Sequence, residues 1–437
     1  MPETSVQQGD RHRVGRILTH AVIGISLLGI AISFAEVRGG ATQAAFAMCN
    51  LLSSMLCVAM AITSHLRRRA TRPWLLIAAA VYVVSGFFGV IFAFTQDPAP
   101  GLLITLVEIA RAFVFLFALP AFSPFSVSDI AKITIKWFYF AAFFLTLEAL
   151  KFSVGKGVGA FNDERLSGQE EDWIHANSIG MYAGLLMLSV MLGRFPRWVQ
   201  VFSLAAGGYI LMLTQSRGSI ASSLIAIFMY ALLHWRDIKF KSVPLVVIPA
   251  LMLLFANPQT ESIMSELPVV GPINKIIQRS QREDPTSGRL ELIGEAMERV
   301  EQSPVFGYGF RGGSFDTKTR VTYIENTFVN ALLESGFLGA FLYVVVMLSA
   351  WVMFFRKTRR SLSKKTDRRS GFDPGVAEAC LIFTTFMIVQ GLTERTTIIQ
   401  NGSAFANAMA IFIGCLCYEP LRYQVDIWRR PTPVIGN

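Results

Sequence analysis

Long apolar runs alternate with short polar segments along almost the whole chain. Each run is about 17 to 25 residues long, which is the length that crosses the hydrocarbon core of a bilayer as a helix. The runs recur from Ile17 to the C-terminal region. They are continuous rather than alternating in polarity, so they do not resemble the strands of a membrane barrel. The pattern predicts an all-α integral membrane protein with about twelve transmembrane helices.

One polar stretch is far longer than the others and divides the apolar pattern in two. We predict an N-terminal cytoplasmic tail over residues 1–16, transmembrane helices one to nine over 17–256, and a long loop over 257–325. Helices ten to twelve follow over 326–418, and residues 419–437 form a cytoplasmic tail.

The long loop is predicted to contain a short amphipathic helix. Thr286 or Ser287 can cap its start, and Pro304 with the glycines that follow ends it. Four apolar positions recur at helical spacing and form one stripe, namely Leu290, Ile293, Met297 and Val300. We expect such a helix to lie on the membrane surface.

The composition agrees with a membrane protein. Of the 437 residues, 53% are hydrophobic and only 16% are charged, with a mean hydropathy of +0.47. An average soluble domain is about a quarter charged. The five cysteines fall inside the apolar runs and form no CxxC pair, so they are interpreted as packing residues.

Basic residues set the predicted orientation. The net charge of +10 does not indicate nucleic-acid binding, because Lys and Arg gather in alternate short loops. They precede the first run, follow the second, fourth and sixth, and crowd residues 356–369 and the C-terminal tail. Such loops face the cytoplasm. Both termini are therefore predicted inside, and the long loop faces outward, into the periplasm if the cell has one.

Two arginines are candidates for binding an anion at the outer face. Arg217 lies in TQSRGS between two apolar runs, and Arg289 lies near the start of the loop helix. A guanidinium group keeps its charge and donates two parallel hydrogen bonds to phosphate oxygens, so this pair suits a diphosphate. Alternatively, each arginine caps a helix or pairs with a loop carboxylate, because arginines at membrane boundaries often reach toward the interface.

Glu325 stands where the long loop returns to the membrane. It is a candidate general base, since a carboxylate is ionised near neutral pH. The alternative is an acidic residue that stabilises a helix N-terminus. His175 and Asn177, in WIHANSIG, occupy a similar position before another apolar run. His175 is either a ligand or acid, or a hydrogen-bonded structural group; no second histidine has metal-site spacing, so no metal is predicted.

Further charged residues are weaker candidates. Glu394 and Arg395, in the outer loop before the last run, can line the same outer cavity. Glu108 and Arg111 are three residues apart on one helix face, which favours a structural ion pair. The chain has no Walker loop and no GxGxxG after a strand, so we predict no nucleotide cofactor.

Five segments taken in order resemble the O-antigen ligase and polysaccharide polymerase superfamily, multi-pass enzymes that use undecaprenyl-diphosphate-linked sugars. They are HANSIG, TQSRGS, SGRLELI, SPVFGYGF and NTFVNALLESGFLG, and the resemblance covers residues 173–339. It implies that Arg217 and Arg289 contact the lipid diphosphate. The expected catalytic residues are Glu325, Arg217 and Arg289, and the expected substrate-binding residues are His175, Asn177, Asn326, Gly307, Gly309, Glu394 and Arg395.

The resemblance also implies the reaction. The ligases of this family carry a histidine before the asparagine where the loop re-enters the membrane, whereas Glu325 precedes Asn326 here. This difference favours polymerases that build exopolysaccharide, capsule or O-antigen from lipid-linked repeat units. An acceptor hydroxyl would attack the anomeric carbon, Glu325 would accept its proton, and undecaprenyl diphosphate would depart toward the two arginines without metal or cofactor.

Other functions stay open at this point. A ligase would transfer the glycan to lipid A-core or another acceptor. A transporter or flippase of lipid-linked sugars is disfavoured, because the polar residues crowd one side of the membrane instead of its midplane and no inverted repeat of broken spans is visible. A scaffold for envelope enzymes is a third class. The expected partners are the lipid-linked donor, the sugar acceptor, the bilayer, and chain-length or export proteins, but no nucleic acid.

Overall fold

The computed structural model describes residues 5–32, 40–63, 68–92, 106–107, 109–155, 176–193, 195–214, 216–234, 289–309, 315–316, 321–322, 326–363, 373–393 and 404–418. These residues are helical apart from turns and one small ribbon. The helical fold class expected from the apolar runs is therefore confirmed.

The helices follow one another with short connections in the described part of the chain. In chain order they are α1 (Ser5–Gly24) with its π-helical continuation η1 (Ile25–Gly29), α3 (Gly40–Thr63), α4 (Pro73–Phe92), the π-helical turn η2 (Val114–Ala118), α6 (Leu119–Phe122), α7 (Val127–Gly155), α8 (Ala176–Leu192), α9 (Arg197–Thr214), α10 (Arg217–Leu233), α14 (Arg289–Gln302), α15 (Thr327–Ser363), α16 (Pro374–Gln390) and α17 (Ala404–Cys417). The strands β1 (Phe315–Asp316) and β2 (Val321–Thr322) pair in antiparallel register.

Three helical stretches among the described residues are long and apolar enough to cross a membrane, judged by length and composition: Arg13–Ile32, Val127–Val154 and Thr327–Arg360. Shorter apolar helices of 10–17 residues accompany them. The expected number of about twelve spans includes sequence outside the described residues, such as residues 243–256, so that number stays a prediction.

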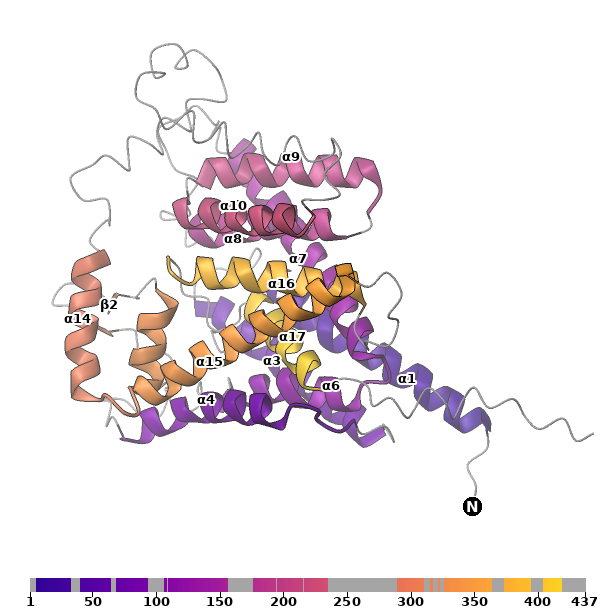
Figure 1. Cartoon of the computed structure of the whole chain (residues 1–437), viewed down its shortest axis with the longest axis horizontal. Coiled ribbons are helices and arrows are strands. Elements are labelled where there is room, and N and C mark those ends of the chain that lie inside the picture. Colours follow the sequence, from indigo (N-terminus) through magenta and orange to yellow (C-terminus); the bar gives the residue numbers. More distant parts are fainter. Residues whose placement is uncertain are drawn as a thin grey trace, which may run out of the picture.

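Most helices run side by side in one bundle (Figure 1). Contacts join α8 to α7, α9 and α10, then α10 to α16, α16 to α15, and α15 to α4. The central helix is α17, in which every residue is buried, as expected for a helix that is apolar on all sides. Aromatic rings fill the space around it: the ring of Phe138 lies 5.6 Å from that of Phe383, and Phe405 lies 6.0 Å from Phe386.

A buried polar network crosses the bundle interior. The guanidinium of Arg111 donates to the side-chain oxygen of Asn407 on α17, and the Asn407 amide donates to the carbonyl of Ser26 in η1 at 3.0 Å. Arg111 is only 1% exposed. Its expected partner Glu108 lies outside the described residues, so the structure assigns Asn407 as a partner of this charge.

Basic residues expected on one side of the membrane gather at one end of the bundle. The Arg68 guanidinium donates to the carbonyls of Pro120, at 2.7 Å, and Phe125. Lys132 forms an ion pair of 2.8 Å with Asp373. The starts of α8 and α10 and the end of α16 lie at the opposite end (Figure 1). This separation agrees with the charge pattern, and the identity of the two membrane sides stays a prediction.

The helix expected in the long loop is present as α14, which lies across the ends of the bundle helices instead of along them (Figure 1). Its buried residues are Ala296 and Val300, which pack against Leu333, whereas Met297 is 36% exposed. The stripe therefore includes one residue packed inside the protein, Val300, and one exposed residue, Met297, and its contact with the membrane stays a prediction. The expected caps Thr286 and Ser287 lie outside the described residues.

The span expected to begin at residue 326 is not one straight helix. Gly336 has φ 65° and ψ −172°, a conformation that divides α15 into a short segment, residues 327–335, and a long helix, residues 337–363. Figure 1 shows the short segment beside α14, at a steep angle to the long helix. Residues 327–335 therefore pack in the end layer that α14 also forms, and the residue at which this span enters the membrane stays a prediction.

Candidate functional site

Ser219 joins three segments at the end of the bundle opposite the basic residues. Its hydroxyl donates to the Asn177 carbonyl at 3.3 Å and accepts from the Gln390 amide at 3.2 Å and from the Ser216 hydroxyl at 3.0 Å. Each of these residues is at least 96% buried. The TQSRGS segment, the HANSIG segment and the end of α16 are therefore held together by buried hydrogen bonds, which have well-defined geometry in a water-poor interior.

The start of α15 attaches to the same end of α16. The backbone N–H of Thr327 donates to the Gly391 carbonyl at 2.8 Å, and the Asn326 side-chain amide donates to the Leu392 carbonyl at 3.0 Å. The Asn326 side-chain oxygen accepts from the N–H groups of Phe328 and Val329 at 3.0 and 3.1 Å. Asn326 is thus the N-cap of α15. A contact of Asn326 with substrate stays a prediction.

Arg217 is the first residue of α10, directly after the N-cap Ser216. The next residue, Gly218, lies so close to α16 that a methyl group there would be 2.0 Å from the Thr393 hydroxyl. The backbone of Arg217 is therefore at the convergence of α8, α10, α15 and α16. A helix N-terminus carries partial positive charge, which favours an anion at this position.

Several expected site residues adjoin these segments in the sequence. His175 and Glu325 lie outside the described residues, immediately before Ala176 and Asn326. Glu394 and Arg395 also lie outside them, immediately after Thr393. Their roles stay predictions.

Arg289 begins α14, which lies beside residues 327–335. The two helices are tied at their C-terminal ends, because the Tyr308 N–H donates to the Leu333 carbonyl and the Phe337 N–H to the Pro304 carbonyl, both at 2.7 Å. Since they run side by side from that tie, their N-termini lie at the same end (Figure 1). Arg289 therefore starts α14 at the end of the pair where Asn326 caps α15.

Gly307 and Gly309 lie at the other end of this helix pair. Gly307 has φ 65°, and a methyl group there would be 2.5 Å from the Leu333 carbonyl oxygen. The Gly309 N–H donates to the Glu334 carbonyl at 2.8 Å. Residues 327–335 span about 13 Å as a helix, so the two glycines are separated from Asn326 by roughly that distance. The structure gives them a packing role at the bend, and substrate binding by them stays a prediction.

Tyr308, between these glycines, fastens the turn to α14. Its hydroxyl donates to the Arg299 carbonyl at 3.1 Å. Partial burial raises the pKa of Tyr308, and the nearby Arg299 opposes that shift in part. The hydroxyl therefore stays protonated, as this hydrogen bond requires, throughout the physiological pH range.

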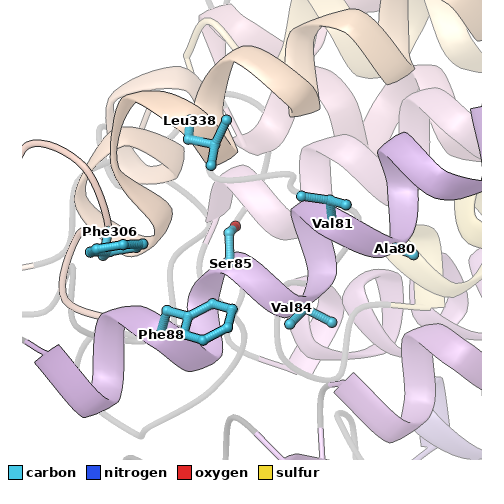
Figure 2. Close-up of a pocket in the computed structure, with 7 residues that line it drawn as sticks. All are labelled: Ala80, Val81, Val84, Ser85, Phe88, Phe306 and Leu338. Atoms are coloured by element: carbon cyan, nitrogen blue, oxygen red, sulfur yellow. The ribbon is translucent and has the colours of Figure 1, made fainter.

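An apolar cavity of about 290 Å³ lies beside this turn (Figure 2). It is lined by Ala80, Val81, Val84, Ser85 and Phe88 of α4, Phe306 of the SPVFGYGF segment, and Leu338 after the bend. The Ser85 hydroxyl donates to the Tyr82 carbonyl at 2.6 Å, so its polarity is satisfied within α4. The walls suit a hydrocarbon chain rather than a sugar.

Several of these motifs fall in a region that matches a known protein family. A family model described as O-Antigen ligase matches residues 201–344, about a third of the chain. Over these residues the chain is similar to the O-antigen ligase family, which supports the resemblance to the O-antigen ligase and polymerase superfamily. No curated protein matches it. This similarity suggests a bacterial membrane enzyme of the glycosyltransferase type that acts on lipid-linked glycans. The matched region contains Arg217, Arg289 and Glu325, whereas Asn177 precedes it and Glu394 follows it.

Sequence reasoning missed the uncharged polar residues of the site. Ser219 lies two residues after Arg217, and Gln390 interrupts the end of an apolar run. Asn330 and Glu334 follow Asn326 at intervals of four residues and are buried. The available signal was a polar residue within an apolar helix, which was not applied to Ser219, Gln390 and Asn330, nor to the charged Glu334.

Proposed function

We propose that this protein polymerises undecaprenyl-diphosphate-linked oligosaccharide repeat units at the periplasmic face of the bacterial inner membrane. The observation that supports this most is the convergence of the α10 N-terminus, which begins at Arg217, with the starts of α8 and α15. Arg289 begins a neighbouring helix at the same end of the α14–α15 pair. A cationic residue at a helix N-terminus is suited to a diphosphate leaving group.

In the proposed reaction, an acceptor sugar hydroxyl forms a bond to the anomeric carbon of the donor glycan. The bond from that carbon to the diphosphate oxygen breaks, and undecaprenyl diphosphate carries the electron pair away. Glu325 accepts the hydroxyl proton. Arg217 and Arg289 stabilise the charge that grows on the diphosphate, an effect that is strong where water is excluded. The apolar cavity beside Phe88 and Phe306 suits the lipid part of such a donor.

The arginine assignment is tested with Arg217→Lys and Arg289→Lys. Both keep the charge but lose the two-pronged phosphate contact, so transfer should fall by roughly a hundredfold or more while membrane expression stays near parental. Arg197→Lys is a matched control, because Arg197 is also the first residue of its helix but is exposed. Parental transfer rates in either test variant would show that its arginine does not bind the diphosphate.

The role of Glu325 is tested with Glu325→Gln and Glu325→His. The glutamine variant keeps the shape but loses the base, which typically lowers turnover by about a hundredfold to ten-thousandfold. The histidine variant supplies another proton acceptor and should recover part of the loss. If the glutamine variant makes polymer at the parental rate and protein level, Glu325 is not the base.

A ligase is the second candidate, since the family match covers both activities. The two are separated by the glycans that accumulate when the gene is deleted. Single lipid-linked repeat units would support the polymerase. Finished polymer retained on its lipid carrier would support the ligase instead.

A further inference from the structure

The apolar cavity beside Phe306 is larger than the voids that packing normally leaves between side chains. Its volume is about 290 Å³, whereas protein interiors contain few voids larger than a water molecule. An apolar cavity of about 150 Å³ holds one benzene molecule, so this one has room for roughly twelve carbon atoms, or about two isoprene units. The cavity therefore has the size of a binding site for part of a lipid chain.

The described residues that line the cavity carry no charge. Apart from Ser85 their side chains are hydrocarbon, and they come from α4, the SPVFGYGF segment and the long part of α15 (Figure 2). The Ser85 hydroxyl already donates to the Tyr82 carbonyl. A sugar or a diphosphate would lose its hydrogen bonds to water on entering this space and would not regain them there, which is unfavourable. The occupant should therefore be apolar.

Close backbone contacts hold the walls of the cavity in place. A methyl group on Gly89 of α4 would lie 2.4 Å from the Gly309 nitrogen and 2.6 Å from the Phe306 carbonyl oxygen. A methyl group on Gly339 would lie 2.5 Å from the Ser85 hydroxyl oxygen. Helix α4 is thus packed directly on both the turn and the long part of α15. The cavity is bounded by tightly packed elements, so it is not a gap between loosely packed helices.

The cavity opens on an apolar surface. Val81, Phe88 and Leu338 line it and are nevertheless 41%, 40% and 47% exposed. Phe337 and Phe341, near Leu338 on α15, are also exposed. Both α4 and α15 are apolar helices that we expect to lie in the bilayer. A lipid chain could therefore enter the cavity from the side without leaving a hydrocarbon environment.

The cavity lies at a defined distance from the proposed diphosphate position. It adjoins the bend, and residues 327–335 separate the bend from Asn326 by roughly 13 Å. The four-carbon backbone of an isoprene unit extends about 5 Å, because a carbon–carbon bond is about 1.5 Å long. With the diphosphate at the convergence, about three isoprene units reach the cavity and about two further units fill it.

We propose that this cavity binds the polyprenyl chain of the donor at about the fourth and fifth isoprene units from the diphosphate. The inference rests on the proposed function for the identity of the head group, but binding of the chain can be measured without glycan transfer. It also implies a minimum chain length. A donor with a shorter chain keeps the diphosphate contact but does not reach the cavity.

The first experiment measures binding of the chain directly. Full-length purified protein, in nanodiscs of phosphatidylethanolamine and phosphatidylglycerol, is irradiated with undecaprenyl diphosphate that carries a photoreactive group at one isoprene unit. With the group at about the fourth or fifth unit, labelling should concentrate on residues 80–88, Phe306 and Leu338. With the group at the far end of the chain, labelling should move to other sites. Unlabelled undecaprenyl diphosphate should suppress the labelling in the cavity, although phospholipid is present in large excess.

The second experiment fills the cavity. Val84→Phe places a ring in the space that the chain would occupy, so labelling there should fall and the donor KM should rise, each by about tenfold or more, with kcat near parental. Its unfolding temperature should not fall, because filling a cavity is commonly stabilising. Ala80→Leu is a smaller second variant with the same expected direction. Val58→Phe is the matched control, because Val58 is exposed on α3 and does not line the cavity.

The third experiment compares donors of different chain length. In the parental protein, a donor with a chain of two isoprene units should have a KM about tenfold or more above that of the undecaprenyl donor. In Val84→Phe the two donors should differ much less, because the longer chain can no longer use the cavity. A chain-length effect of equal size in both proteins would contradict the inference.

The remaining outcomes separate the alternatives. Labelling that is spread evenly over exposed apolar residues, for every position of the photoreactive group, would overturn the inference. Labelling in the cavity that unlabelled undecaprenyl diphosphate does not suppress would also overturn it and assign the cavity to acyl chains of the bilayer. If Val84→Phe does not reach the membrane, Ala80→Leu decides, and a parental donor KM there would count against the site. If the parental protein is labelled as expected but transfers no glycan, the proposed function fails while the chain site stands.

Discussion

The bend at Gly336 should depend on glycine. Its φ of 65° and ψ of −172° lie in a region that is essentially restricted to glycine, and holding another residue there costs about 1 to 3 kcal/mol. A methyl group at this position would also lie 2.1 Å from the Val305 carbonyl oxygen and 2.3 Å from its carbon. These are backbone atoms, which cannot move aside by rotating a side chain.

The two effects add, because the Phe337 N–H donates to the Pro304 carbonyl at 2.7 Å and holds the two segments together at the bend. Overpacking typically costs a further 1 to 3 kcal/mol, so we expect Gly336→Ala to destabilise the fold by about 3 kcal/mol or more. Transfer activity should also fall. The short segment holds Asn326 at its other end, and a misplacement of about 1 Å at a reacting site can lower the rate roughly a hundredfold.

The measurement combines thermal unfolding of the detergent-solubilised protein with glycan transfer in membranes. Gly208→Ala and Gly294→Ala are matched controls, since both glycines are helical and no neighbouring atom lies within 4 Å of an added methyl group. Each control should be stabilised by about 0.5 to 1 kcal/mol, owing to the better helix propensity of alanine. Parental unfolding temperature and activity in Gly336→Ala would refute the glycine dependence of the bend.

Two further predictions concern the interior and the topology. Asn407→Leu should lower stability by about 1.5 to 3 kcal/mol, measured by thermal unfolding, because Arg111 loses a hydrogen-bond partner. Asn407→Asp keeps an acceptor for Arg111 but loses the donor to the Ser26 carbonyl, so its destabilisation should be smaller, and equal loss in both would contradict this account. A cysteine introduced near Gly313 should react with an impermeant thiol reagent in intact cells whose outer membrane has been permeabilised. A cysteine introduced near Ser363 should not react. The native cysteines in the described residues are buried or half-buried and give little background, and the reverse labelling would exclude the predicted orientation.

Hydropathy predicted the helices well but not how the end layer packs. The sequence predicted α14 as an amphipathic helix. Its expected apolar stripe included Met297, which is exposed, and left out Ala296, which is buried against residues 327–335. A small side chain lets α14 approach the segment 327–335 closely, and a hydropathy pattern does not report which neighbour a helix meets. The bend was missed for a related reason, since an apolar run with one glycine has the same hydropathy whether φ is negative or positive.

The candidate site was predictable only in part. Charged residues near membrane boundaries are visible in sequence, which is how Arg217 and Arg289 were found. The hydrogen bond from Gln390 to Ser219 joins residues 171 positions apart, and neither side chain is charged. Such pairing depends on how α10 and α16 pack, so no local pattern could reveal it.

The polarity of the helix ends explains how an anion site can form where four helices meet. The helices α8, α10 and α15 begin at this convergence, so their partial positive ends face it. The end of α16 would oppose them, but its last carbonyls are occupied: Thr327 N–H binds that of Gly391, and the Asn326 amide binds that of Leu392. N–H groups at two of the helix starts are capped as well, by the side chains of Asn326 and Ser216, so Arg217 carries the full positive charge at this position and the helix ends add only a partial one. This arrangement is consistent with the proposed contact between the lipid diphosphate and the α10 N-terminus, where a charged side chain and a helix start have the same sign.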